Sequence, residues 1–297
     1  MIPSLHTGTV RFSKSEEYLA HLAQKTFLSF WSHPNLFRAQ NRELADLIVI
    51  FDQDIVIFSD KSCEFKVGEH GWGRWYRKVI LNSANQLHRA AAWIRKHPTE
   101  IYMDAKCERH FPLHVPSNPS IHLVAVATGV RAAAEQHFDG DGTLMLHTDA
   151  DGSTPFMIGD LDRAKDFVHV FADASFTAVL SERDTISDFV TYLRKRAAFL
   201  RSGPEILADS ELALLAHYFR NAHDGEHEFA VDTRDVDPSL IYIPDDWSFF
   251  AQSIPYKRKK AADAESYVWD DIIEAAARQA DQGRLVRGRT GVWTLRC

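Results

Sequence analysis

Two short apolar runs in the first quarter of the chain dominate the pattern of hydrophobic and polar positions. Residues 47–51 read Leu-Ile-Val-Ile-Phe and residues 55–58 read Ile-Val-Ile-Phe, with a polar break at 52–54. Two runs of β-forming residues joined by a few turn-forming residues predict a β-hairpin. Successive positions of both runs are apolar, so we expect both faces of this hairpin to be covered inside a sheet.

Helices are predicted on both sides of the hairpin along the chain. Residues 15–31 carry apolar side chains at helical spacing, and residues 75–96 repeat such a stripe before Pro98 closes it. A buried strand is predicted over residues 121–128, which are apolar from Leu123 to Ala127. These elements predict an α/β fold in which helices flank a mixed central sheet.

The pattern changes after about residue 130. Strands are predicted over 156–161, 167–171 and 176–180, and helices over 184–200, 210–221 and 266–279. The basic run 257–260 is assigned to a linker before the last helix. We therefore place a domain boundary near residue 133, with an α/β domain over residues 1–133 and an α+β domain over residues 134–297.

The charge of the chain bears on its partners. The net charge is -7, so the overall field does not favour nucleic acid and any polyanion site must be a local basic patch. One such patch follows the predicted second helix, where cations alternate with aromatic residues; it fits a nucleic-acid face and equally a solvated helix face over buried tryptophans. Its members are Arg74, Arg77, Lys78, Arg89, Arg95 and Lys96, with Trp72, Trp75, Tyr76 and Trp93.

Cysteine usage and the N-terminal sequence bear on location. Cys63, Cys107 and Cys297 are far apart and form no CxxC pair, which indicates reduced thiols and neither a zinc site nor a disulfide framework. No apolar signal region and no membrane-spanning length is present in the sequence. We expect a cytoplasmic protein that makes no membrane contact.

Charged residues stand at one end of the predicted hairpin. Asp46 opens the first run, while Ser59 and Lys61 lie two apart at the end of the second and share a face, with Asp60 pointing the other way. A turn at 52–54 predicts that Asp46 lies opposite positions 60 and 61, next to Lys61. The two form either a structural ion pair or part of a site.

A second carboxylate would turn that pair into a metal site. Glu16 lies three residues before Leu19 on the first predicted helix and faces the sheet, and Gln86 projects from the second. Two carboxylates with backbone oxygens are the ligands that Mg²⁺ or Mn²⁺ prefers. A lysine near the attacking water would then stabilise the charge that builds up on a phosphodiester during hydrolysis.

This order of elements resembles the PD-(D/E)XK nuclease superfamily over about residues 10 to 130. Asp46 matches the first metal-binding acid, Lys61 the catalytic lysine, Glu16 or Glu17 the helix acid, and Gln86 the glutamine of RecB-like members. The resemblance implies a restriction-endonuclease-like fold, bound Mg²⁺ or Mn²⁺, and a hydrolase acting on nucleic acid, with DNA as the partner.

The chain departs from this family at one position. Its second acid stands two residues before the lysine, where this chain has Ser59. Three alternatives stay open: Asp60 turned inward by a bulge, Glu16 completing the site from the helix, or a site that binds metal weakly or not at all. In the last case the protein would be a decayed nuclease scaffold that binds nucleic acid or a partner. For residues 134–297 we weigh orienting DNA, forming a homodimer and binding a partner.

Overall fold

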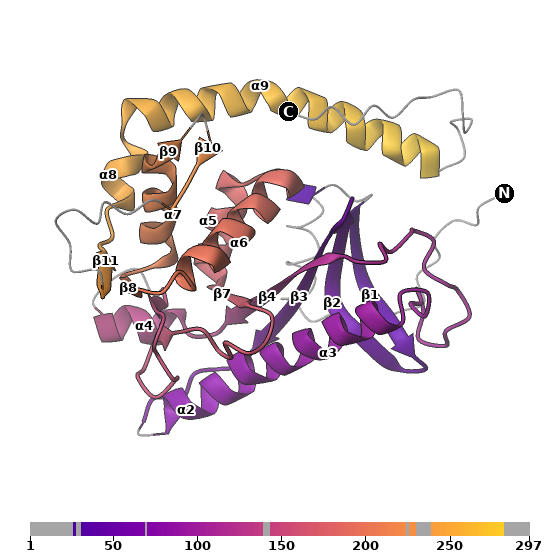
Figure 1. Ribbon diagram of the computed structural model, residues 1–297, viewed down its shortest axis with the longest axis horizontal. Helices are drawn as coiled ribbons and strands as arrows, with labels where there is room; N and C mark the ends of the chain where they lie inside the picture. Colours follow the sequence, from indigo (N-terminus) through magenta and orange to yellow (C-terminus); the bar gives the residue numbers. More distant parts are fainter. Residues whose placement is uncertain are drawn as a thin grey trace.

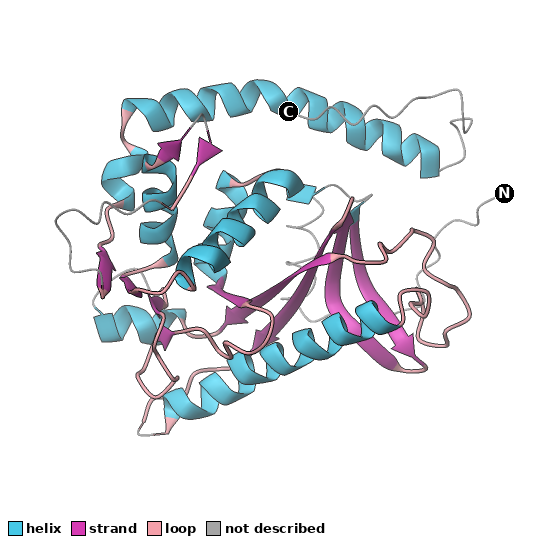
Figure 2. Cartoon of the chain, in the orientation of Figure 1, coloured by secondary structure: helices cyan, strands magenta, loops and turns pink. Residues whose placement is uncertain are grey.

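The computed structural model describes residues 26–27, 31–68, 70–138, 143–223, 226–229 and 239–281. A five-stranded sheet crosses the molecule, with helices on both of its faces (Figures 1 and 2). This confirms the predicted α/β class with a mixed sheet flanked by helices. No helix in the described ranges has the length and apolar character that a membrane span requires.

The large sheet has the strand order β1-β2-β3-β4-β7. Strand β2 runs antiparallel to both of its neighbours, β1 and β3, and β4 and β7 continue the sheet parallel to β3. The strands are β1 (Ser32–Ala39), β2 (Arg42–Phe51), β3 (Asp54–Ser62), β4 (Ser120–Thr128) and β7 (Val168–Ala172).

The predicted hairpin is confirmed as β2 and β3. Its turn is tighter than expected, because Asp54 already pairs with Phe51 and only Asp52 and Gln53 lie between the strands. Asp52 has a φ of 51°, the left-handed conformation that such a short turn requires. The pairing continues in regular register to Leu47 opposite Phe58. Extended by one residue, this register places Asp46 opposite position 59, whereas the prediction placed it opposite positions 60 and 61.

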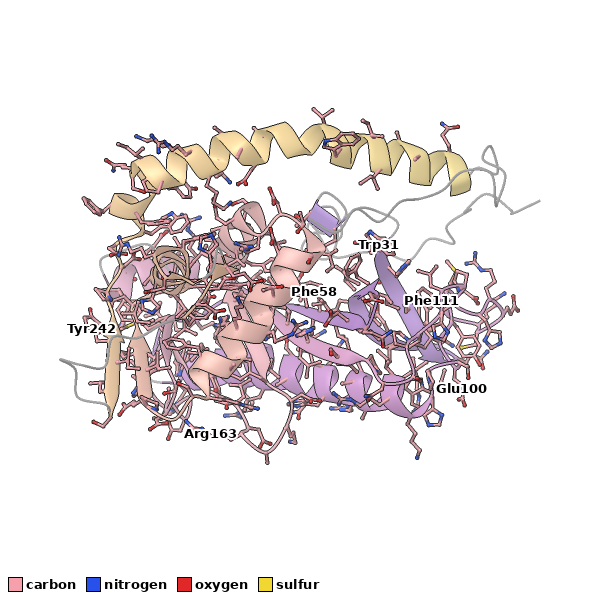
Figure 3. All side chains as sticks on the ribbon, turned by 45° about the horizontal axis from the view of Figure 1, so that its top comes forward. Trp31, Phe58, Glu100, Phe111, Arg163 and Tyr242 are labelled. Carbon is pink, nitrogen blue, oxygen red and sulfur yellow. The ribbon has the colours of Figure 1, made fainter. Side chains whose placement is uncertain are left out.

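Two hydrophobic cores lie on opposite faces of this sheet. One face carries Ile48 and Ile57 and packs under α2 (Gly71–Tyr76), a π-helical turn η1 (Arg77–Leu81) and α3 (Asn82–Lys96). The other face carries Val49 and Phe58 and packs under α5 (Asp173–Glu182) and α6 (Ile186–Leu200). Phe58, labelled in Figure 3, is fully buried, and its ring stacks on Phe189 of α6 with centroids 6.2 Å apart.

A smaller sheet with the order β11-β8-β5-β6 packs beside the first. Its strands are β5 (Met145–His147), β6 (Met157–Ile158), β8 (Glu205–Ala208) and β11 (Leu240–Ile243). The remaining elements are α4 (Arg131–Phe138), α7 (Glu211–Arg220), β9 (Ala222–His223), β10 (Glu226–His227), α8 (Trp247–Ala251) and α9 (Ile254–Asp281). The long helix α9 runs over α7 and α8 at the top of Figure 1.

The boundary predicted near residue 133 lies inside one structural unit. Strand β7, from beyond the boundary, pairs with β4 over five register positions from Leu123 to Ala127. The core under α3 also combines residues from both sides, such as Ile57 with Val170. The two predicted halves therefore share a sheet and both of its cores.

A buried ionic network joins α6 and α7 behind β7. Arg196 donates to both carboxylate oxygens of Glu211, at 2.9 and 2.8 Å, and the Tyr192 hydroxyl donates to the same carboxylate at 2.7 Å. Arg196 is 1% exposed and Glu211 is 3% exposed. Arg196 also donates to Nδ1 of His169 at 3.2 Å, and burial lowers the pKa of His169 well below its usual value, so this imidazole is neutral.

Several predicted elements are corrected. Residues 33–35, expected to end the first helix and lead to the hairpin, lie inside edge strand β1. Residues 176–180, predicted as a strand, belong to helix α5, and the basic run 257–260 lies inside α9 rather than in a linker. The predicted helix 15–31 lies almost entirely outside the described residues, although Phe27 is buried in the core under α6.

Candidate active site

The candidate site lies where β2 begins and β3 ends, on the sheet face covered by α3. Side chains alternate along a strand, and Leu44, Ile48 and Ile57 belong to the core under α3. Asp46, Ser59 and Lys61 occupy the matching positions of the same two strands and therefore share this face. The predicted placement of Ser59 and Lys61 on one face is the one observed.

Asp46 is the centre of the site. Its Oδ2 accepts a hydrogen bond from the backbone N–H of Asp60 at 2.6 Å, and its Oδ1 accepts one from Nε2 of Gln86 at 3.1 Å. The Nζ of Lys61 lies 3.8 Å from Oδ2. A carboxylate that is only 3% exposed needs such donors, because they replace the water it has lost.

Lys61 forms the open side of the site. Its side chain is 35% exposed, whereas that of Asp46 is almost sealed. The ammonium group therefore stands between the buried carboxylate and solvent. A cation in this position can attract an anionic substrate and remains accessible to water.

Ser59 lies in an enclosed hydroxyl cluster next to Asp46. Its Oγ lies 3.3 Å from the Oγ of Ser83 and 3.4 Å from Oε1 of Gln86, and Ser59 and Ser83 are fully buried. One hydroxyl proton satisfies one acceptor at a time, so Ser59 and Ser83 share donor and acceptor roles. Ser83 was missed in the sequence, although it stands three residues before Gln86 and so faces the same side of the helix.

Asp60 does not join Asp46 on this face. It lies two residues after Phe58 and so shares the face of the opposite core. Strand β3 pairs with β4 without a break from Asp54 to Ser62. The bulge that would turn the Asp60 carboxylate inward is therefore absent from the described β3–β4 pairing. Asp60 contributes its backbone N–H to Asp46 instead.

The predicted helix acids Glu16 and Glu17 lie outside the described residues. The donor set that the described part of the site offers to a divalent ion is therefore one carboxylate, the Ser59 hydroxyl and the Gln86 amide oxygen. Within the described ranges, no three His, Cys, Asp or Glu side chains gather closely enough to hold a metal ion. These residues fit one side of a magnesium shell, and a second carboxylate is needed to complete it.

The helices that carry the predicted basic patch begin at the same end of the strands as Lys61. Nε1 of Trp75 in α2 donates to the backbone oxygen of Thr128 at 3.3 Å, and Thr128 pairs with Ser62, the neighbour of Lys61. The Thr128 hydroxyl donates in turn to the backbone oxygen of Lys61 at 3.3 Å. These contacts fix the start of the basic segment beside the mouth of the site.

The chain matches no family model, no curated protein and no solved structure. The class of protein is therefore inferred from its strand order and from the geometry around Asp46.

Proposed function

We propose that this protein is a nuclease-like hydrolase of the PD-(D/E)XK type that cleaves phosphodiester bonds of DNA with Mg²⁺ or Mn²⁺. The observation that carries the proposal is the convergence of Asp46, Lys61 and Gln86 at the carboxyl end of β3. The sheet around it supports the assignment: three antiparallel strands are followed by a helix and a parallel strand. This order agrees with the restriction-endonuclease-like fold expected from the resemblance.

In this proposal, metal binding, orientation of the carboxylate and phosphate binding belong to different residues. Asp46, together with Glu16 or Glu17, would hold the ion, which supplies Lewis-acid stabilisation of charge on the scissile phosphate. Gln86 fixes the orientation of the Asp46 carboxylate through its amide N–H. Lys61, open to solvent, binds the phosphate and orients the attacking water, because its ammonium donates hydrogen bonds and carries positive charge.

Lys61→Ala should lower the rate of DNA cleavage by about 10²- to 10⁴-fold, the usual contribution of a positioned proton-transfer or charge-stabilising group. The measurement is cleavage of labelled DNA with Mg²⁺ or Mn²⁺ by the full chain. Lys66→Ala is the matched control. Lys66 is an exposed lysine in the loop after β3, and its substitution removes the same charge. Equal rates for the two variants, or no cleavage by the wild-type protein, would refute the proposal.

A second candidate function follows from Ser59. Its hydroxyl is enclosed with Ser83 and Gln86, where a working site of this type carries its second acid. In this alternative the protein retains the scaffold to bind nucleic acid or a partner, and it hydrolyses nothing. Calorimetric titration with Mn²⁺ separates the two functions, because binding that Asp46→Asn abolishes supports the enzyme and no binding supports the scaffold.

Ser59→Asp should tighten Mn²⁺ binding at least tenfold if the protein is an enzyme, and it should create measurable Mn²⁺ binding if the protein is a scaffold. The new carboxylate would lie on the same face as Asp46 and supply the second anionic ligand that divalent cations favour. Ser59→Asn is the control, since it has the same shape and no charge, and thermal unfolding of both variants reports the cost of the larger side chain. If the two bind Mn²⁺ equally, Ser59 does not occupy the ligand position.

A further inference from the structure

The helical segment from α2 through η1 to α3 (residues 71–96) carries two groups of basic side chains, one at 74–78 and one at 89–96. It contains six arginine and lysine side chains and no aspartate or glutamate, in a chain whose net charge is -7. All six cations are exposed, and most of the apolar side chains between them, such as Val79, Ile80 and Leu87, are buried in the core. We call the exposed side of residues 71–96 the basic face.

Most cations of the basic face are available to a partner. Arg95 is held by Asp166 through two hydrogen bonds at 2.6 and 3.1 Å. The others, Arg74, Arg77, Lys78, Arg89 and Lys96, make no ion pair with another described residue. Unpaired cations along a single helical segment, with no acidic residue among them, attract a polyanion and release its counterions on contact.

The aromatic residues of the segment offer no open ring. Trp72, Trp75 and Tyr76 are buried in the core, with Trp72 and Trp75 stacked at 5.4 Å. The ring of Trp93 is covered by the Arg38 guanidinium at 5.6 Å and by His97, stacked at 4.3 Å. Single-strand binding depends on aromatic platforms for the bases, so this surface fits a partner recognised through its phosphates alone.

We infer that the basic face binds the phosphate backbone of double-stranded nucleic acid; the choice of nucleic acid as partner rests on the proposed function. The segment is 26 residues long, or about 39 Å at the helical rise, which matches roughly eleven base pairs of duplex. The face begins beside Lys61, because Trp75 attaches α2 to the end of β4. A duplex bound to this surface would therefore lie close to the carboxyl ends of β3 and β4, where the site opens.

The π-helical turn η1 contributes to this arrangement. Arg77 and Lys78 open η1, and both are exposed, while Val79 and Ile80 of the same turn are buried. A π turn widens the helix locally, and such turns are frequent at functional sites. Two adjacent cations therefore leave the helix at its widest point.

The test is binding of the full chain to a labelled duplex of about 20 base pairs in EDTA, followed by fluorescence anisotropy over a salt series. The variant Arg77→Gln/Lys78→Gln should bind at least tenfold more weakly at low salt, and its slope of log affinity against log salt should fall by about 1.8. The control is Lys257→Gln/Arg258→Gln in α9, an exposed adjacent pair with the same charge change, and it should bind within about twofold of wild type.

A second pair, Arg74→Gln/Arg89→Gln, repeats the measurement at two other exposed positions in case the first variant is unstable. The inference is overturned if the wild-type protein binds no duplex, if the control loses as much affinity as the variants, or if single strands bind more tightly. Binding to phosphatidylserine vesicles in place of duplex would also overturn it. Binding is measured in EDTA and therefore depends on neither metal nor cleavage. If the protein binds duplex in EDTA but cleaves no DNA when Mg²⁺ or Mn²⁺ is supplied, the inference is upheld and the proposed activity alone is refuted.

Discussion

Replacing Glu211 by glutamine should lower the free energy of unfolding by about 3 to 5 kcal/mol, the usual cost of removing one partner from a buried ion pair. The substitution leaves the Arg196 guanidinium, 1% exposed, without its countercharge. It also weakens the acceptor of the Tyr192 hydroxyl. Urea unfolding of the full chain at pH 7 measures the change.

Glu226→Gln provides the control for this prediction. Glu226 pairs with Lys195 at 2.9 Å, but its side chain is 73% exposed, so solvent screens the pair and its loss should cost far less stability than the loss of Glu211. Replacing both buried partners, as in Arg196→Met/Glu211→Leu, should recover most of the stability, because neither charge of the pair is then left buried without its partner. A Glu211→Gln variant as stable as the Glu226→Gln variant would show that the buried pair contributes nothing.

A fragment ending at residue 133 should fail to fold cooperatively, although it contains the whole candidate site. It leaves β4 without β7, and it removes α5 and α6 from the face that carries Val49 and Phe58. Burial of apolar surface is the main favourable term in folding, so a sheet with one bare face lacks the energy to order its chain. Circular dichroism during urea unfolding should show a gradual transition in place of a cooperative one.

Mixing this fragment with residues 134–297 should restore a cooperative transition, because the shared sheet and cores can then reassemble. If the first fragment alone unfolds cooperatively, with the stability of the full chain, the boundary near residue 133 separates true domains. In that case the contacts across it would be secondary.

The sequence predicted the hairpin and the shared face of Ser59 and Lys61 because both follow from local alternation. It missed β1, because His33 and Pro34 near the start of this strand are residues that often end a helix. Pairing with β2 places them in an edge strand instead. It took residues 176–180 for a strand because Phe176 and Val179 are β-formers, yet packing against the sheet selects helix α5. The hydroxyl cluster of Ser59 and Ser83 joins residues 24 apart and depends on tertiary contact.

The late position of β7 has a consequence during synthesis of the protein. Strand β4 ends at Thr128, and β7 begins about forty residues later, at Val168. At typical rates of translation, a nascent chain would display the open edge of β4 for roughly 2 to 8 seconds before its partner leaves the ribosome. During that interval, apolar β4 is a template for pairing with other chains, so a chaperone that shields it should raise the yield of folded protein.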